Sequence, residues 1–203
     1  MSVLVVQTGV ANTASVCAAL ARCGLTPELS ADPERIAVCD RVVLPGVGSF
    51  GAGMAVLETQ GIASAVRERA GQGRRTLAIC LGLQLLARAS EESPGVAGLG
   101  VVDATVTRFS DGTTCPQFGW NRVSPPGGSD VIRPGFAYFA NSYRIRTAPA
   151  GWEAAMSEHG GPFVAALWRA GVLACQFHPE LSGSWGLGVI RRWAESTKEV
   201  AAC

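Results

Sequence analysis

The chain has 203 residues, of which 48% are hydrophobic and 16% are charged. This composition excludes a disordered chain and predicts one globular domain over residues 1–203. The net charge of +1 comes without a basic run, so neither nucleic acid nor an anionic membrane is an expected partner. No apolar stretch approaches the roughly 18 residues that span a bilayer, and the N-terminus lacks the charged flank of a signal peptide, so we expect a cytoplasmic protein.

Apolar runs and helical spacing alternate over the first 90 residues. The predicted strands cover residues 3–6, 27–30, 41–44 and 76–79. Helices are expected after the capping residues Asn12 or Thr13 and Asp32, and again up to about residue 70, with a break near Gly61. This alternation predicts an α/β fold with a mostly parallel central sheet and helices on both of its faces.

The second half of the chain has apolar segments separated by Pro and Gly turns. Additional strands are predicted at residues 101–109, 117–123, 137–146, 163–168 and 172–177, and a closing helix is predicted at 186–196. Residues 125–129 (Pro-Pro-Gly-Gly-Ser) are expected to form a surface loop rather than a domain boundary. We therefore expect these C-terminal-half strands to belong to the same domain.

Residues 76–86 (Thr-Leu-Ala-Ile-Cys-Leu-Gly-Leu-Gln-Leu-Leu) are the most informative stretch. A short apolar strand is followed at once by an apolar helix, with the small residues Ala78 and Gly82 on either side of Cys80. This is the pattern of a nucleophile elbow, in which a sharp turn lifts the central side chain clear of the sheet. The helix N-terminus favours a thiolate at Cys80, and its N–H groups can stabilise an oxyanion. The alternative is a buried structural cysteine.

Two histidines, His159 and His178, are available to assist a nucleophilic cysteine. His178 ends an apolar strand, and Glu180 can return to accept the imidazole N–H and fix its tautomer. His159 lies in a glycine-rich stretch and is predicted to be a solvated turn residue. A cysteine at an elbow with a strand-end His-x-Glu is more specific than either part, although a structural histidine is the alternative for His178. The seven cysteines have no paired metal-type spacing, so we expect reduced thiols and no metal site.

A G-x-G-x-x-G sequence from Gly46 to Gly51 follows the third predicted strand. A dinucleotide site normally follows the first strand and has an acidic residue about 20 positions further on. Residues 71–80 contain no Asp or Glu. We therefore favour the interpretation that the glycines bring backbone N–H groups near Cys80 as a second oxyanion donor. Loops that follow adjacent parallel strands meet at the carboxyl edge of a sheet, which would place them together.

These motifs resemble those of the class I, triad-type glutamine amidotransferases, and the resemblance covers nearly the whole chain. Within that superfamily the chain is similar to the glutaminase subunits of imidazole glycerol phosphate synthase, an enzyme of histidine biosynthesis. The segments that carry the resemblance are residues 8–12, 45–48, 80–86, 91–96, 119–121, 142–143 and 176–180.

The resemblance implies a glutaminase that works through a cysteine thioester. Cys80 attacks the side-chain amide of glutamine, and His178, oriented by Glu180, delivers a proton to the leaving ammonia before water hydrolyses the thioester. The resemblance assigns the oxyanion and the amino-acid end of the substrate to Gly46, Val47, Gly48, Leu81, Gln84, Ser142 and Tyr143. The peptide of Val47 is expected to reorient before its loop offers an N–H group to the oxyanion.

The resemblance also implies a protein partner, and no metal or organic cofactor. In this family the glutaminase forms a heterodimer with a β/α-barrel cyclase, which uses the ammonia to make imidazole glycerol phosphate. The residues that the resemblance places at this interface are Asn12, Trp120, Asn121, Tyr138 and Leu181.

Several residues depart from the family's pattern, four of them near the expected ammonia-delivery face. This chain has Gln7 where the family commonly has an acid, Gln117 and Asn141 where it usually has histidine, Phe118 where it usually has methionine, and Leu181 where it usually has a basic residue. The departures leave open a paralogous glutaminase that supplies another synthase. A non-catalytic scaffold is a further alternative, against which the intact triad argues. An independent cysteine hydrolase or redox protein would not need the Pro-Gly-Val-Gly loop or the segment around Trp120.

Overall fold

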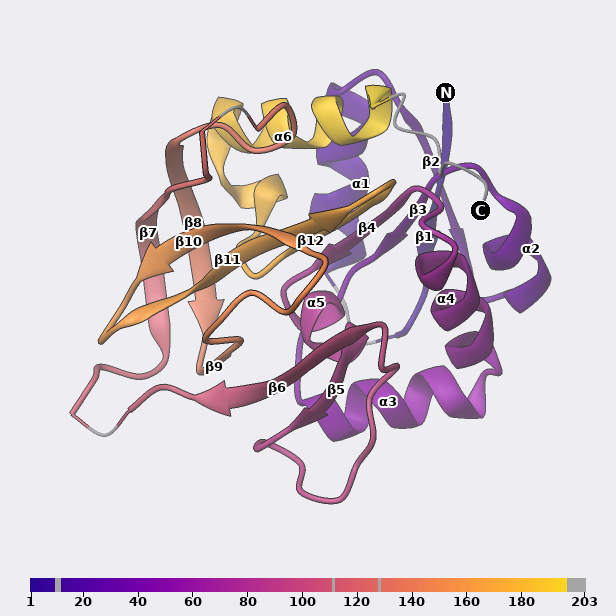
Figure 1. Cartoon of the computed structure of the whole chain (residues 1–203). Coiled ribbons are helices and arrows are strands. Elements are labelled where there is room, and N and C mark those ends of the chain that lie inside the picture. Colours follow the sequence, from indigo (N-terminus) through magenta and orange to yellow (C-terminus); the bar gives the residue numbers. More distant parts are fainter. Residues whose placement is uncertain (10–11, 111, 128, 197–203) are drawn as a thin grey trace.

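The fold was analysed on a computed structural model that describes residues 1–9, 12–110, 112–127 and 129–196 (Figure 1). Val10 and Ala11 of the 8–12 motif, Gly128 of the expected surface loop and Cys203 lie outside the described residues. None of the helices in the described ranges is long and apolar enough to cross a membrane.

A central sheet of seven strands organises the described part of the chain. Five parallel strands lie in the order β12 (Val172–Cys175), β4 (Thr76–Ile79), β3 (Val42–Leu44), β1 (Ser2–Val6) and β2 (Thr26–Ser30). Next to β12, the antiparallel strands β11 (Pro162–Arg169) and β10 (Glu153–Glu158) complete one edge. The predicted, mostly parallel α/β sheet with added C-terminal-half strands is confirmed.

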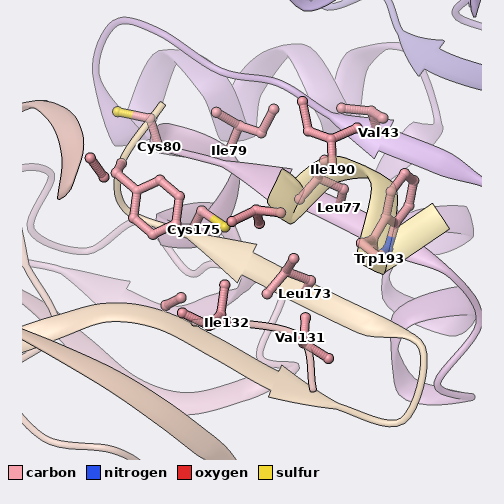
Figure 2. Packing of buried hydrophobic residues seen from close by; sticks show 14 of the residues in the cluster. Val43, Leu77, Ile79, Cys80, Val131, Ile132, Leu173, Cys175, Ile190 and Trp193 are labelled. Atoms are coloured by element: carbon pink, nitrogen blue, oxygen red, sulfur yellow. The ribbon is translucent and has the colours of Figure 1, made fainter. Parts of the chain in front are cut away.

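Helices cover both faces of this sheet, as predicted (Figure 1). One face carries α1 (Thr13–Arg22) and α6 (Gly183–Glu195), and the other carries α2 (Pro33–Val38), α3 (Phe50–Thr59), α4 (Ile62–Gly71) and α5 (Leu81–Leu86). Successive strand residues point to opposite faces, so Val43, Leu77 and Ile79 join the α1/α6 core (Figure 2), whereas Leu44 and Ala78 join the other.

Helix starts follow the expected local chemistry. The Asn12 side chain accepts the Ser15 N–H at 3.3 Å, and Asp32 accepts the Glu34 N–H at 2.9 Å, so both residues cap the helices that follow. The break near Gly61 is present, and Gly61 separates α3 from α4 with a φ of +69° that glycine adopts without strain.

Further strands lie beside the central sheet. They are β5 (Ala87–Ser90), β6 (Val102–Arg108) and β9 (Tyr143–Arg144) in one group, and the antiparallel hairpin of β7 (Gln117–Val123) and β8 (Gly135–Asn141) in another. The short helix η1 (Pro179–Leu181) follows β12.

The strands differ from the sequence-based prediction in three ways. The single strand predicted at residues 137–146 is two strands, β8 and β9, because the chain changes sheets at Ser142. The strand predicted at 172–177 ends at Cys175, since the backbone turns towards η1. Strands β5 and β10 were not predicted, because their sequences are rich in Ala, Ser and charged residues rather than β-branched ones.

Candidate active site

Cys80 lies at the sharp turn between β4 and α5, as the elbow pattern predicts. Its φ of +53° and ψ of −107° are strained for a residue with a side chain. The Cys80 N–H donates to the Cys175 carbonyl at 2.7 Å, which ties the turn to the neighbouring strand. Gly82 is required two residues later, because a Cβ there would lie 2.2 Å from the Leu44 carbonyl oxygen. The strained turn is therefore held by its surroundings.

His178 and Glu180 form a buried pair at the exit of β12. The His178 Nδ1 donates to Glu180 Oε1 at 2.8 Å, and the two side chains are only 9% and 4% exposed. The His178 backbone N–H donates to the Tyr138 carbonyl at 2.9 Å, so the neighbouring hairpin also fixes this residue. Burial alone would lower the pKa of His178, but hydrogen bonds and charge interactions with Cys80 and Glu180 outweigh it and raise the pKa from 6.5 to about 10. The arrangement therefore favours an imidazolium beside the thiol sulfur.

A chain of side-chain amides also contacts the thiol. Gln176 Nε2 donates to the Cys80 Sγ at 3.8 Å, and Gln176 Oε1 accepts from Gln84 Nε2 at 3.1 Å. Gln84 Nε2 also donates to the Tyr143 carbonyl at 3.1 Å. These contacts fix the orientation of Gln84, a predicted substrate-binding residue, relative to the sulfur.

The glycine-rich loop that follows β3 lies against the elbow. A Cβ on Gly46 would lie 2.8 Å from the Leu81 Cβ and 2.9 Å from the Gly82 nitrogen, so the two backbones are in close contact. Strands β3 and β4 pair in parallel, which produces the predicted juxtaposition of their loops. Gly48 has a φ of +100°, a conformation that favours glycine.

The first N–H groups of helix α3, which follows this loop, donate to side chains of the same protein. The Phe50 N–H donates to Glu92 Oε2 at 2.6 Å, and the Gly51 N–H donates to the Ser93 Oγ at 3.0 Å. In a dinucleotide site, these N–H groups would face a pyrophosphate. Their internal partners argue against the dinucleotide interpretation.

A pocket of about 370 Å³ opens over the thiol, a volume within the range of small-molecule sites. Its lining includes the predicted residues Val47, Gly48, Cys80, Leu81, Gln84, Ser142, Tyr143 and His178. Gly46 and Glu180 lie behind it, where a void of about 10 Å³ is also bordered by Asn12 and His178. The sequence interpretation missed Glu92, Pro116 and Ala140, which also line the pocket. Glu92 lay within a segment that carried the resemblance, but no role was assigned to it.

His159 lies outside this pocket, in the predicted turn between β10 and β11, but it is half-buried rather than solvated. Its Nε2 is 2.7 Å from the Thr114 carbonyl, and its ring meets Phe109 edge to face. Of the two histidines, His178 therefore lies in the pocket with Cys80.

Three of the five residues predicted at a partner interface lie on the β7–β8 hairpin, where they point to two different faces, whereas Asn12 caps α1. Trp120 pairs with Tyr138 across the strands, so both point to the outer face, where Trp120 is 59% exposed. Leu181, in the neighbouring η1, is also exposed. Asn121 points to the other face and donates to the Glu158 carbonyl at 2.7 Å.

Comparisons with known proteins identify chains that are similar over nearly the whole length of this one. The family model described as "Glutamine amidotransferase class-I" matches residues 4–188. The "Imidazole glycerol phosphate synthase subunit HisH" of Symbiobacterium thermophilum is 38% identical, with 94% of this chain and 92% of that protein covered. The subunit of the same name from Escherichia coli K12 is 37% identical, with 96% and 100% covered. A crystal structure of a glutamine amidotransferase matches with a TM-score of 0.77 and 22% identity, over 95% of this chain and 97% of that one.

Proposed function

Because the chain belongs to the class-I glutamine amidotransferases, and within them to the HisH subunits of imidazole glycerol phosphate synthase, we propose that Cys80, His178 and Glu180 are its catalytic triad. The observation that carries this proposal is the buried His178–Glu180 pair beside a cysteine on a strained elbow, at the floor of a pocket. A nucleophile, a base and a group that orients the base are the parts that acyl transfer needs.

The proposed reaction has two steps. The Cys80 thiolate attacks the side-chain amide carbon of glutamine, and the His178 imidazolium gives its proton to the leaving nitrogen, so that ammonia departs and a glutamyl thioester remains. Neutral His178 then takes a proton from water, the hydroxide attacks the thioester carbonyl, and glutamate leaves with return of the thiolate–imidazolium pair. Glu180 accepts the N–H of His178 and stabilises the imidazolium.

The oxyanion is proposed to lie between the N–H of Leu81 and an N–H of the Gly46–Gly48 loop. The close contact of Gly46 with Leu81 supports this placement, because it brings the two backbones to the same side of Cys80. Reorientation of the Val47 peptide remains part of the proposal. Val47 is 39% exposed, so its side chain does not lock the peptide in a core.

Glutamine is the proposed substrate, with its amino-acid end held by Gln84 and the backbone at Ser142 and Tyr143. The carboxylate of Glu92 lines the same pocket and suits the substrate's ammonium group.

The proposed partner is the β/α-barrel cyclase of the synthase, which receives the ammonia in a heterodimer and makes imidazole glycerol phosphate. Support comes from the names of the relatives and from the outer face of the β7–β8 hairpin. There, Phe118, Trp120 and Phe136 are 70%, 59% and 60% exposed, an apolar aromatic surface typical of binding sites. A cytoplasmic location is part of the proposal, because the thiolate mechanism needs a reduced Cys80.

Glutamate release from glutamine tests the proposal. We would measure it for the purified chain alone, with the cyclase and its ligand, and for Cys80→Ala. Strong stimulation by the cyclase and complete loss in Cys80→Ala are expected. Turnover that depends on Cys80 but ignores the cyclase would indicate a glutaminase for another synthase. Absence of turnover under every condition would contradict the catalytic proposal and favour a scaffold.

A further inference from the structure

Glu92, in the turn that follows β5, lines the proposed glutamine pocket and also contacts the start of helix α3. Glu92 Oε2 accepts the Phe50 N–H at 2.6 Å, and Ser93 Oγ accepts the Gly51 N–H at 3.0 Å. Ser49 occupies the N-cap position of α3, but its side chain makes no capping hydrogen bond. The first two N–H groups of α3 are therefore held by residues more than 40 positions away in the sequence.

The contact between this turn and α3 is close. A Cβ on Gly51 would lie 2.9 Å from the Ser93 Oγ, closer than real Cβ contacts allow. The other side of the turn is fixed to β6, where Glu91 Oε2 accepts the Arg108 N–H at 2.9 Å. The turn thus joins a strand on one side and a helix on the other.

Helix α3 begins two residues after Gly48, so its first turn is one anchor of the proposed oxyanion loop. The other anchor is the contact of Gly46 with Leu81. A loop this short transmits any movement of the α3 N-terminus to the N–H groups between the anchors. Glu92 faces the glutamine pocket as well. It therefore touches both the place of the substrate and the support of the loop.

We propose that Glu92 and Ser93 are positioning residues of the glutaminase reaction, which hold the first turn of α3 and thereby place the Gly46–Gly48 loop over Cys80. This inference rests on the proposed function, because it assumes that the loop supplies an oxyanion donor. Negative charge is favoured at a helix N-terminus, which suits the Glu92 carboxylate in this role. Ser93 adds a neutral acceptor that does not border the pocket.

Ser93→Ala separates positioning from substrate binding. It removes the acceptor of the Gly51 N–H and leaves the lining of the pocket unchanged. We expect kcat to fall about ten-fold with KM for glutamine unchanged. Complete removal of an oxyanion donor lowers kcat by roughly 10²–10³-fold, and a donor that is only displaced should lower it less. The matched control is Glu91→Ala, which breaks the contact of the same turn with β6. It should lower the thermal midpoint without changing kcat more than two-fold.

Glu92 is tested by comparing Ala with Gln. Both variants lose the charge that faces the pocket, so both should raise KM. Gln retains an oxygen that accepts the Phe50 N–H, so Glu92→Gln should keep about ten-fold more kcat than Glu92→Ala, by the same displacement argument. Amide hydrogen exchange at Phe50 and Gly51 should accelerate in Glu92→Ala and Ser93→Ala, but not in Glu91→Ala.

Gly51→Ala gives an independent test, because the added methyl group pushes on the Ser93 Oγ. Gly51→Ala should lower kcat as Ser93→Ala does. Because both changes act on one contact, the loss of kcat in the double variant Gly51→Ala/Ser93→Ala should be smaller than the product of the two single losses. Kinetics are measured on the full chain, alone and with the cyclase. The inference is overturned if Ser93→Ala and Gly51→Ala keep wild-type kcat, or if Glu91→Ala loses as much as Ser93→Ala. Absence of Cys80-dependent turnover in the wild type would instead contradict the proposed function.

Discussion

The carboxyl edge of the parallel sheet and the β7–β8 hairpin border the same pocket, but they are built differently. At the edge, Cys80 and His178 are buried, and the close backbone contact of Gly82 with Leu44 fixes the turn that carries Cys80. On the outer face of the hairpin, Phe118 and Trp120 are mostly exposed. The difference teaches that the chemistry rests on a rigid scaffold, whereas the exposed apolar surface is available for a partner.

The largest effect is expected at the triad within the rigid edge. Glu180→Gln should lower kcat by roughly 10³–10⁴, because an amide no longer fixes the tautomer of His178 or stabilises its charge. The measurement is steady-state glutamine hydrolysis, with circular dichroism to establish that the fold is retained. Glu158→Gln, a matched change on β10, should keep full activity. A loss of less than ten-fold in Glu180→Gln would contradict the role of Glu180.

The rigidity of the edge is tested by Gly82→Ala. The added Cβ would lie 2.2 Å from the Leu44 carbonyl oxygen, so we expect the free energy of unfolding to fall by about 3 kcal/mol or more. Urea denaturation measures this difference. Gly71→Ala on α4 is the control, since a Cβ there meets nothing within 4 Å and Ala is the better helix former by about 1 kcal/mol. Equal stabilities of the two variants would contradict the account of the elbow.

In the β7–β8 hairpin, a substitution should weaken partner binding while leaving stability nearly unchanged. Trp120→Ala removes a side chain that is 59% exposed, so stability should change by less than about 1 kcal/mol. Affinity for the cyclase should fall by about 2 kcal/mol, or roughly 30-fold, as for a central aromatic residue of an interface. Isothermal titration calorimetry measures the affinity. Val38→Ala on α2 removes a comparably exposed apolar side chain elsewhere and should not affect binding. Wild-type affinity in Trp120→Ala would move the interface away from the hairpin.

The pH dependence of stability tests the charged pair within the rigid edge. The folded-state pKa of His178 is raised from 6.5 to about 10, so the stability that its protonation contributes is complete below 6.5 and is lost as the pH rises towards 10. Wild-type stability should therefore decline relative to His178→Gln over this range. Denaturation at pH 6, 8 and 10 measures the difference. Parallel curves would show that folding does not favour the imidazolium.

The regions also differ in how far the sequence predicted them. Apolar runs and capping residues predicted the parallel half, because strands buried on both faces have few alternatives. Strand β10, with the sequence Glu-Ala-Ala-Met-Ser-Glu, is not predicted because these residues have low strand propensity. Its pairing with β11 stabilises the strand instead.

The candidate site shows the same division between local and long-range information. The local spacing of Cys80, His178 and Glu180 predicts a triad from the sequence alone, because each motif has a chemical meaning. Glu92 was given no role, because its contact with Phe50 spans 42 positions and follows from the fold alone. The orientation of Asn121, which points away from Trp120, likewise depends on the register of the hairpin.

The most direct test of the account is an NMR titration of the His178 imidazole. The chain has two histidines, so the His178 resonance can be assigned by one substitution at His159. If Cys80, His178 and Glu180 act as one unit, the wild-type resonance should titrate near pH 10, and Cys80→Ala should move the midpoint down, because the contacts with the sulfur are lost. A midpoint near 6.5 in both proteins would contradict the thiolate–imidazolium pair on which the proposed mechanism depends.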